Sequence, residues 1–229
     1  VKSCLAAIRG TGAVKALAHI TGGGFPDNIP RALPASLGAD IDLSRVPLDA
    51  SVSPLEAAGD LQKQKFSYAT EKGDRVPGIL LKAKAASGRL PVVIMLHGTG
   101  GNKDAQPELL ADLASRQFLA VAIDGRYHGE RAGGGRGSTA YVNAILNTYR
   151  TGKEHPFLYD TVWDVMRLID YLETRADVDP ARIGVIGFSK GGMEAYLAAA
   201  VDPRLRATVP CIGVQSFRWA LDNDAWQSR

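Results

Sequence analysis

Cysteine and long apolar runs are scarce in this sequence. Its two cysteines, Cys4 and Cys211, have no Cys-x-x-Cys spacing, so neither a disulfide framework nor a structural zinc site is expected. The apolar runs, of which Phe118–Ile123 is an example, are too short to cross a bilayer. The N-terminal region lacks the unbroken apolar stretch of a secretory signal. These absences predict a soluble protein of the cytoplasm with no membrane partner.

A strong excess of charge of one sign is also lacking. Lys and Arg number 27, and Asp and Glu number 24, which gives a net charge of +3. This bias is too small to predict nucleic acid as a partner. Histidines and carboxylates show no metal-ligand spacing such as H-E-x-x-H, so no metal or other cofactor is expected. With 45% hydrophobic and 22% charged residues, the composition is that of a globular protein.

The spacing of glycine, proline and apolar residues divides the chain into three parts. Residues 1–45 hold a glycine triplet and several prolines, but too few large apolar side chains for a core of their own. Residues 46–63, rich in Pro, Ser, Ala and Asp, are predicted to be a connector. Residues 64–229 have the alternating pattern of an α/β protein.

The third part is expected to contain a sheet flanked by helices. Strands are predicted at residues 64–70, 76–82, 91–96, 118–123, 182–187 and 207–214, and helices at 108–117, 159–174 and 190–200. The first two strands are separated by a short turn and predict a hairpin. The later strands are short apolar runs that alternate with helices, which predicts a mostly parallel sheet covered on both faces.

The sharpest motif fits the pattern G-x-S-x-G and reads Gly187-Phe188-Ser189-Lys190-Gly191-Gly192. It lies between an expected strand and an expected helix, where such a motif forms a tight turn that exposes its serine. Glycine is needed around the serine because the strained turn leaves no room for side chains. The following helix N-terminus presents free N–H groups to a developing oxyanion. The motif therefore predicts a nucleophilic Ser189 rather than an idle turn residue.

A second glycine-rich segment follows the expected strand at 91–96 and reads His97-Gly98-Thr99-Gly100-Gly101. Alone, it would fit any anion-binding loop, since glycines expose backbone N–H groups. Together with the serine turn, it predicts an oxyanion hole made by the N–H of Thr99 or Gly100 and the N–H of Lys190.

From about residue 66 to residue 229 the chain resembles an α/β-hydrolase of the dienelactone hydrolase and acetyl xylan esterase type. The segments that carry the resemblance are residues 97–104, residues 124–131, the helix from residue 159 and the serine turn. The resemblance implies a small ester substrate and hydrolysis through an acyl-serine intermediate. The second glycine of the turn, Gly192, is also similar to prolyl-oligopeptidase-like peptidases, which are the alternative enzyme class.

The N-terminal part resembles a different family. Residues 12–24 and 28–31 are similar to part of phosphoribosylformylglycinamidine cyclo-ligase, an enzyme of purine biosynthesis. Only a fragment matches, so the resemblance implies no activity. It predicts that the chain is a chimera of a purine-enzyme fragment and a hydrolase core.

Histidine is absent after the predicted nucleophile. In this fold the catalytic acid and the histidine follow the serine in chain order. All four histidines precede Ser189 in this sequence: His19, His97, His128 and His155. We therefore expect a C-terminally truncated hydrolase core whose triad is incomplete within the chain.

Three interpretations follow. In the first, His97 or His128 acts as the base, with Asp124 or Glu130 as orienting carboxylate, because both histidines follow central strands. The alternative for each of these histidines is that it holds its own loop in place. In the second interpretation, the oxyanion hole alone sustains slow turnover of activated esters. In the third, the chain is a non-catalytic hydrolase core.

Two further expectations concern the acyl group and the assembly. Residues 61–63 and 124–137 are expected to frame the pocket, and their little apolar bulk predicts acyl groups from acetyl to butyryl. Truncation would leave the last expected strand, with Val209 and Ile212, at a sheet edge. Exposed apolar edges pair with other chains, so a homo-oligomer is expected.

Overall fold

The computed structural model describes residues 46–133, 137–151 and 157–213, so the predicted purine-enzyme fragment at 1–45 lies outside the described residues. The strands are β1 (Ser51–Val52), β2 (Glu56–Ala58), β3 (Leu61–Glu71), β4 (Asp74–Ala83), β5 (Leu90–Leu96), β6 (Leu119–Ile123), β7 (Val178–Phe188) and β8 (Leu205–Cys211). The helices are α3 (Pro107–Ser115), α4 (Gly137–Thr151), α5 (Phe157–Glu173) and α6 (Lys190–Val201), with a short 3-10 helix, η1, at Gly129–Ala132.

All these strands belong to one sheet, in the order β1-β3-β4-β6-β5-β7-β8, with β2 also paired to β3. β3 and β4 form the predicted antiparallel hairpin, and β4 pairs antiparallel with β6. From β6 through β5 and β7 to β8 all neighbours are parallel. The predicted α/β class is confirmed, and the arrangement is an α/β-hydrolase fold with a mixed sheet.

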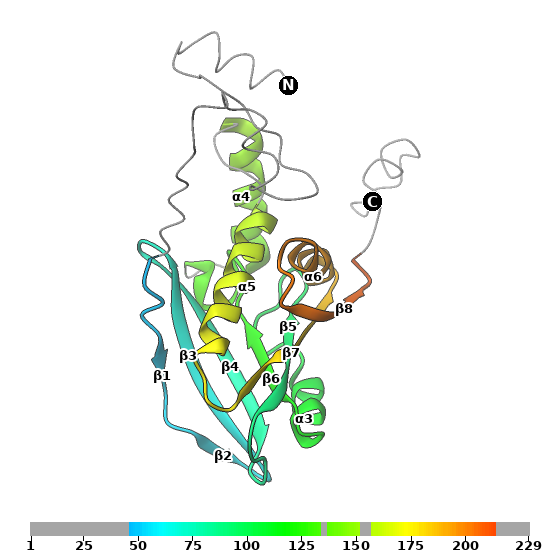
Figure 1. Ribbon diagram of the computed structural model, residues 1–229. Helices are drawn as coiled ribbons and strands as arrows, with labels where there is room; N and C mark the ends of the chain where they lie inside the picture. The colour runs from blue at the N-terminus through cyan, green and yellow to red at the C-terminus, as the bar shows by residue number, and fades with distance from the viewer. Residues whose placement is uncertain (1–45, 134–136, 152–156, 214–229) are drawn as a thin grey trace, which may run out of the picture. The chain divides into compact units, whose positions relative to one another are not determined.

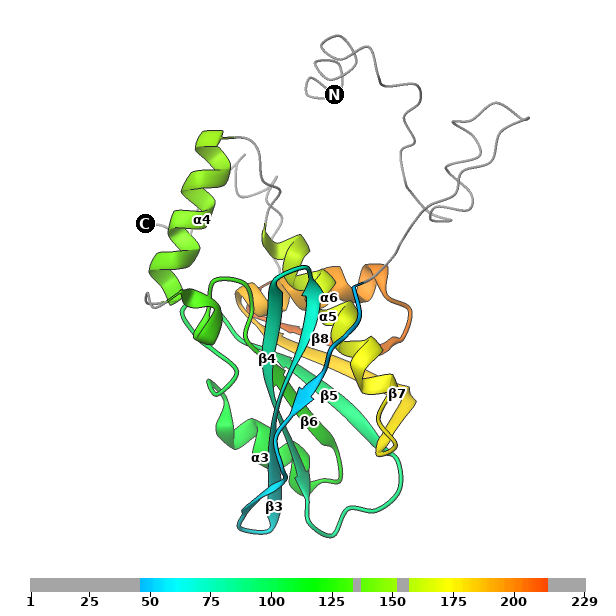
Figure 2. The same cartoon turned by 90° about the vertical axis from the view of Figure 1, so that its left-hand side faces the viewer.

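Helices cover the sheet on both faces, α5 and α6 on one and α3 on the other (Figures 1 and 2). The larger apolar cluster lies under α5 and α6, where the helical spacing of Val162, Val165, Ile169 and Leu172 places them on the sheet. A smaller cluster that includes Leu110 lies under α3. Every residue of β6 is buried because this strand is covered on both faces, which is why its sequence is a continuous apolar run.

The segment predicted as a connector contributes to the sheet. β1 and β2 lie within residues 46–63 and pair antiparallel with β3, which itself begins at Leu61 rather than at residue 64. Such short outer strands are held by backbone hydrogen bonds, and all their side chains are exposed, so no alternation marks them in the sequence. The segment predicted as a connector therefore contains strand residues, and its bounds stay a prediction.

A helix that the sequence analysis did not predict, α4, follows the loop after β6 (Figure 2). Its apolar residues Val142, Ile145, Leu146 and Tyr149 recur at helical spacing, but all four are exposed. The apolar repeat therefore did indicate a helix. The β-branched and polar residues around it have low helix propensity, which made that indication weaker.

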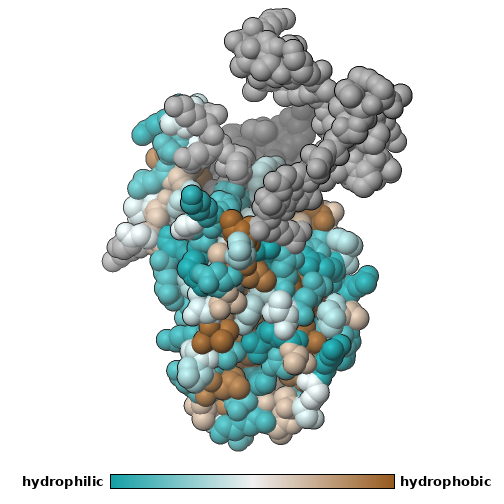
Figure 3. Space-filling model, turned by 60° about the vertical axis from the view of Figure 1, so that its left-hand side comes forward, coloured by the Kyte–Doolittle hydropathy of each residue, from teal (hydrophilic) through white to brown (hydrophobic). Residues whose placement is uncertain are grey.

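The face in Figure 3 is mainly hydrophilic, with single apolar residues scattered over it. None of the helices in the described ranges combines the length and apolar character needed to cross a membrane.

Candidate active site

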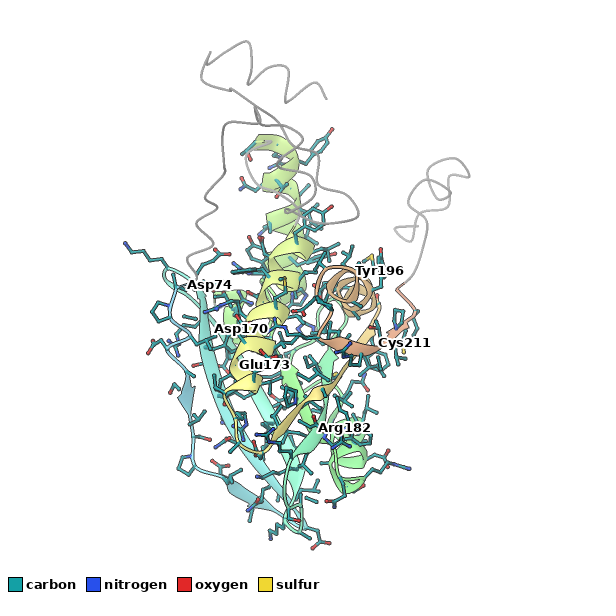
Figure 4. All side chains as sticks on the ribbon, viewed as in Figure 1. Asp74, Asp170, Glu173, Arg182, Tyr196 and Cys211 are labelled. Carbon is teal, nitrogen blue, oxygen red and sulfur yellow. The ribbon has the colours of Figure 1, made fainter. Side chains whose placement is uncertain are left out.

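Ser189 occupies a strained turn between β7 and α6. Its backbone angles, φ 53° and ψ −114°, are rare for a residue with a side chain and cost about 1–3 kcal/mol. Neighbouring backbone groups hold the turn: the Ser189 N–H donates to the carbonyl of Cys211 at 2.8 Å, and the Ser189 carbonyl accepts from Gly192 N–H at 2.9 Å. Cys211 lies at the end of β8 (Figure 4). The predicted turn geometry is present, and the nucleophilic role of Ser189 stays a prediction.

The glycines around Ser189 are required by backbone packing. A Cβ atom on Gly187 would overlap the carbonyl of Gly191, and one on Gly191 would overlap the carbonyl of Leu96. A Cβ atom on Gly192 would lie 2.8 Å from the carbonyl oxygen of Cys211, which is closer than real contacts allow. The crowding predicted for Gly187 and Gly191 is therefore present, and Gly192 is crowded as well.

The glycine-rich loop after β5 lies against the serine turn. A Cβ atom on Gly98 would lie 3.5 Å from the Cβ of Ser189 and 3.3 Å from the carbonyl oxygen of Phe188. Thr99 and Gly100, the next two residues, are exposed. Lys190 is the first residue of α6, where a backbone N–H has no partner within the helix. The predicted oxyanion donors thus come from two segments that meet at Ser189, and their role stays a prediction.

Both ring nitrogens of His97 are engaged by backbone groups. Nε2 accepts a hydrogen bond from Gly125 N–H at 3.0 Å, so Nδ1 carries the proton and donates to the carbonyl of Gly98 at 2.8 Å. Burial and, as the next largest cause, the nearby Lys190 ammonium together lower the pKa of His97 to about 3. This geometry favours the interpretation that His97 holds the oxyanion loop, because no lone pair is left to accept a proton.

His128 has one nitrogen without a partner. Nδ1 lies 2.7 Å from the carbonyl of Arg126, which can only accept, so Nδ1 carries the proton and Nε2 has its lone pair free. Nε2 is buried and has no hydrogen-bond partner among the described residues. The ring lies 5.0 Å from that of His97 and meets the Tyr141 ring of α4 edge-on at 5.4 Å. Burial lowers the pKa of His128, which keeps the imidazole neutral.

The candidate orienting carboxylates do not bond to either histidine. Asp124 accepts from the backbone N–H and the ammonium of Lys103, at 2.8 and 2.9 Å, and from Glu130 N–H at 2.9 Å. Glu130 also pairs with the Lys103 ammonium, at 2.6 Å. The ammonium and amide donors nearest to these carboxylates are those of Lys103 and Glu130, and they take the hydrogen bonds in this structure. The role of Asp124 or Glu130 as an orienting carboxylate stays a prediction.

An ion cluster attaches the loop of His128 to the rest of the fold. Asp164 of α5 is fully buried and accepts from Arg126 at 3.2 Å and from Arg131 at 2.6 Å. Both arginines also reach Asp74 in the β3–β4 hairpin, at 2.7 and 2.6 Å (Figure 4). The loop is therefore tied to α5 and to the hairpin by charge-assisted hydrogen bonds.

The sequence analysis missed a buried ion pair directly behind the serine. Lys190 Nζ donates to both carboxylate oxygens of Glu194, at 2.8 and 3.0 Å, and each side chain is 1% exposed. The spacing of four residues on a helix was the available signal, since it permits a Glu–Lys contact. Burial of the pair could not be read from the sequence.

Two of the four histidines, His19 and His155, lie outside the described residues. Within the described ranges, no group of three or more His, Cys, Asp or Glu could hold a metal ion. At the expected rim of the pocket, Lys63 pairs with Asp104 at 3.1 Å and links the start of β3 to the loop after β5.

Comparison with known families identifies the chain's relatives. Residues 41–221 match the family model described as acetyl xylan esterase (AXE1). The predicted resemblance to esterases of this type is therefore confirmed at the level of the family. The resemblance of the N-terminal part to a cyclo-ligase finds no support in the comparisons.

Solved structures with the same fold include several esterases. An acetyl xylan esterase from Paenibacillus sp. R4 is 29% identical, with a TM-score of 0.63 over 79% of this chain and 59% of its own. An acetyl xylan esterase from Thermoanaerobacterium sp. JW/SL YS485 is 22% identical, with a TM-score of 0.56 over 78% and 57%. A candidate dienelactone hydrolase from Klebsiella pneumoniae is 23% identical, with a TM-score of 0.54 over 68% and 62%. This chain covers less than two thirds of the length of each.

Proposed function

The chain belongs to the acetyl xylan esterase family (AXE1), and from this premise we propose that it is a carboxylic ester hydrolase that removes acetyl groups from an acetylated carbohydrate such as xylan. The observation that carries the proposal is the strained Ser189, set between a helix N-terminus and the loop of Gly98. Two of the similar structures are acetyl xylan esterases, which supports acetyl as the acyl group.

The proposed reaction forms and then breaks an acyl-serine. Ser189 Oγ attacks the ester carbonyl and loses its proton to a base, and the carbonyl oxygen becomes an oxyanion. The N–H groups of Lys190 and of Thr99 or Gly100 stabilise that charge; one such donor is worth about 3 kcal/mol. The intermediate collapses, the alcohol leaves with a proton, and water hydrolyses the acyl-serine to release the acid.

Among the described histidines, the base is assigned to His128. Its unprotonated Nε2 is free, whereas both nitrogens of His97 are engaged by backbone groups. Because Nε2 has no partner in the described residues, it makes no direct hydrogen bond to Ser189. Transfer of the serine proton therefore requires a bridging water molecule or a shift of the loop of His128.

Ester hydrolysis by the purified chain tests the proposal. We expect p-nitrophenyl acetate and butyrate to be hydrolysed faster than long-chain esters, and acetate to be released from acetylated xylan. Ser189→Ala should abolish this activity, and His128→Gln should reduce kcat by 10²-fold or more, as loss of a general base does. If the parent chain hydrolyses these esters no faster than buffer does, only the interpretation as a non-catalytic hydrolase core remains.

A matched variant separates the two histidines. His97→Gln removes the ring that holds the oxyanion loop and is expected to reduce activity less than His128→Gln. If His128→Gln stays as active as the parent while Ser189→Ala is inactive, the assignment of the base is wrong, and catalysis depends on the serine and the oxyanion hole alone.

A further inference from the structure

The buried pair of Lys190 and Glu194 has no role in the reaction described above. Transfer of two charges from water to the protein interior costs several kcal/mol per ion, and their attraction only partly offsets that cost. Both side chains are almost completely buried, and Thr161 also hydrogen-bonds Glu194. A buried ion pair therefore need not stabilise the fold. The position of this pair next to the site is more informative about its role.

The ammonium of Lys190 lies against the backbone that connects the two histidines. A Cβ atom on Gly125 would lie 3.0 Å from Lys190 Nζ and 3.5 Å from His97 Nε2. The Gly125 N–H donates to His97 Nε2 at 3.0 Å, and the Gly125 carbonyl accepts from His128 N–H at 3.1 Å. Lys190 thus fills the space beside the one residue to which both His97 and His128 are bonded.

We propose that Lys190 is a positioning residue of the esterase site: anchored by Glu194, it supports the turn at Gly125–His128 and thereby holds the His128 imidazole in place. The inference rests on the proposed function, in which Ser189 and His128 act together. It concerns the side chain of Lys190 alone, since the proposed oxyanion donor is the backbone N–H of the same residue.

The charge of Lys190 also acts on His128. Among the described residues, the charged or titratable side chains that face the His128 ring are those of Lys190 from α6, Asp124 from its own loop, His97 from the end of β5 and Tyr141 from α4. The ammonium of Lys190 disfavours a second positive charge on the ring, whereas Asp124 favours it. Without the ammonium, His128 should accept a proton at a higher pH and lose its function as a base there.

The test is the double variant Lys190→Met with Glu194→Leu in the full chain. Removing both partners avoids an unpaired buried charge, and two apolar side chains of similar size keep the packing. We expect the His128 ring, followed by NMR of its imidazole, to titrate about one pH unit higher than in the parent. We expect the acid limb of the kcat profile for p-nitrophenyl acetate to rise by the same amount.

Two further variants make the test specific. Lys82→Met removes a lysine of another ion pair, with Asp177 at 3.0 Å, and should leave the His128 titration unchanged. Lys190→Gln replaces the double variant if that one does not fold, because burial raises the pKa of Glu194 and allows it to remain as a neutral acid. A His128 titration equal to that of the parent in the Lys190 variants overturns the proposal. An inactive parent would refute the proposed function, and the NMR titration would still decide the influence of Lys190.

Discussion

The ring of His97 makes the folded chain sensitive to acid. In the folded state its pKa is lowered to about 3, mainly by burial, while in the unfolded chain it is close to 6.5. Between these values the unfolded state binds a proton that the folded state does not, so the stabilising contribution is complete above pH 6.5 and is lost as the pH falls. The pKa of His128 is shifted in the same direction and adds to the effect.

We therefore expect the free energy of unfolding to fall by several kcal/mol, on the order of 4 from His97, between pH 7 and pH 3. Urea unfolding at a series of pH values measures this. In His97→Asn the decrease should be clearly smaller, although the variant is less stable at pH 7. Parallel curves for parent and variant would show that His97 is not responsible.

At the scale of single residues, the sequence predicted the turn but not the chemistry of its neighbours. The crowding at Gly187 and Gly191 follows from a motif whose glycines have one geometric reason, so it could be foreseen. The hydrogen bonds of His97 and His128 depend on which carbonyls and amides lie within reach, and that is fixed only by the folded loops. For the same reason Lys103, the partner of Asp124, had no signal in the sequence.

The ion cluster of Asp164 with Arg126 and Arg131 is expected to control the loop that carries His128. Asp164→Asn leaves Arg126 and Arg131 with only exposed or half-buried carboxylate partners. Removal of one member of a buried ion pair costs about 3–5 kcal/mol. We expect a lower unfolding midpoint in urea and a loss of esterase activity.

Glu173→Gln on the same helix is the control, because its pairing with Arg204 at 2.9 Å is partly exposed. Its effect should stay within about 1 kcal/mol, the usual value of a surface pair. If both substitutions lower the free energy of unfolding equally, the Asp164 cluster stabilises the protein no more than a surface ion pair does.

Elements with a strong repeat were predictable, and those at the margin of the sheet were not. The hairpin, the central strands, α5 and α6 were all expected, with bounds that differ by a few residues. Their apolar patterns arise from burial against a sheet or a helix, which leaves a periodic signal. β1, β2 and α4 bury little apolar surface. The composition of their segments therefore does not reveal that they form strands and a helix.

On the scale of the whole molecule, the expected homo-oligomer stays a prediction that β8 can test. Val209 and Ile212, at and just after β8, are exposed among the described residues. If these side chains lie at an interface between copies, Val209→Lys should shift the mass measured by light scattering toward that of a monomer. A parent that is already monomeric at micromolar concentration would contradict the prediction.

The hydrogen bond from Ser189 N–H to the Cys211 carbonyl has a mechanical consequence. β8 pairs with β7 alone among the described strands, so within this part of the chain the turn of Ser189 is held by an outer strand of the sheet. Outer strands open at lower free energy than central ones. As denaturant is added, Ser189 would relax out of its strained conformation while the central sheet is still folded, and the proposed ester cleavage would disappear before the secondary structure does.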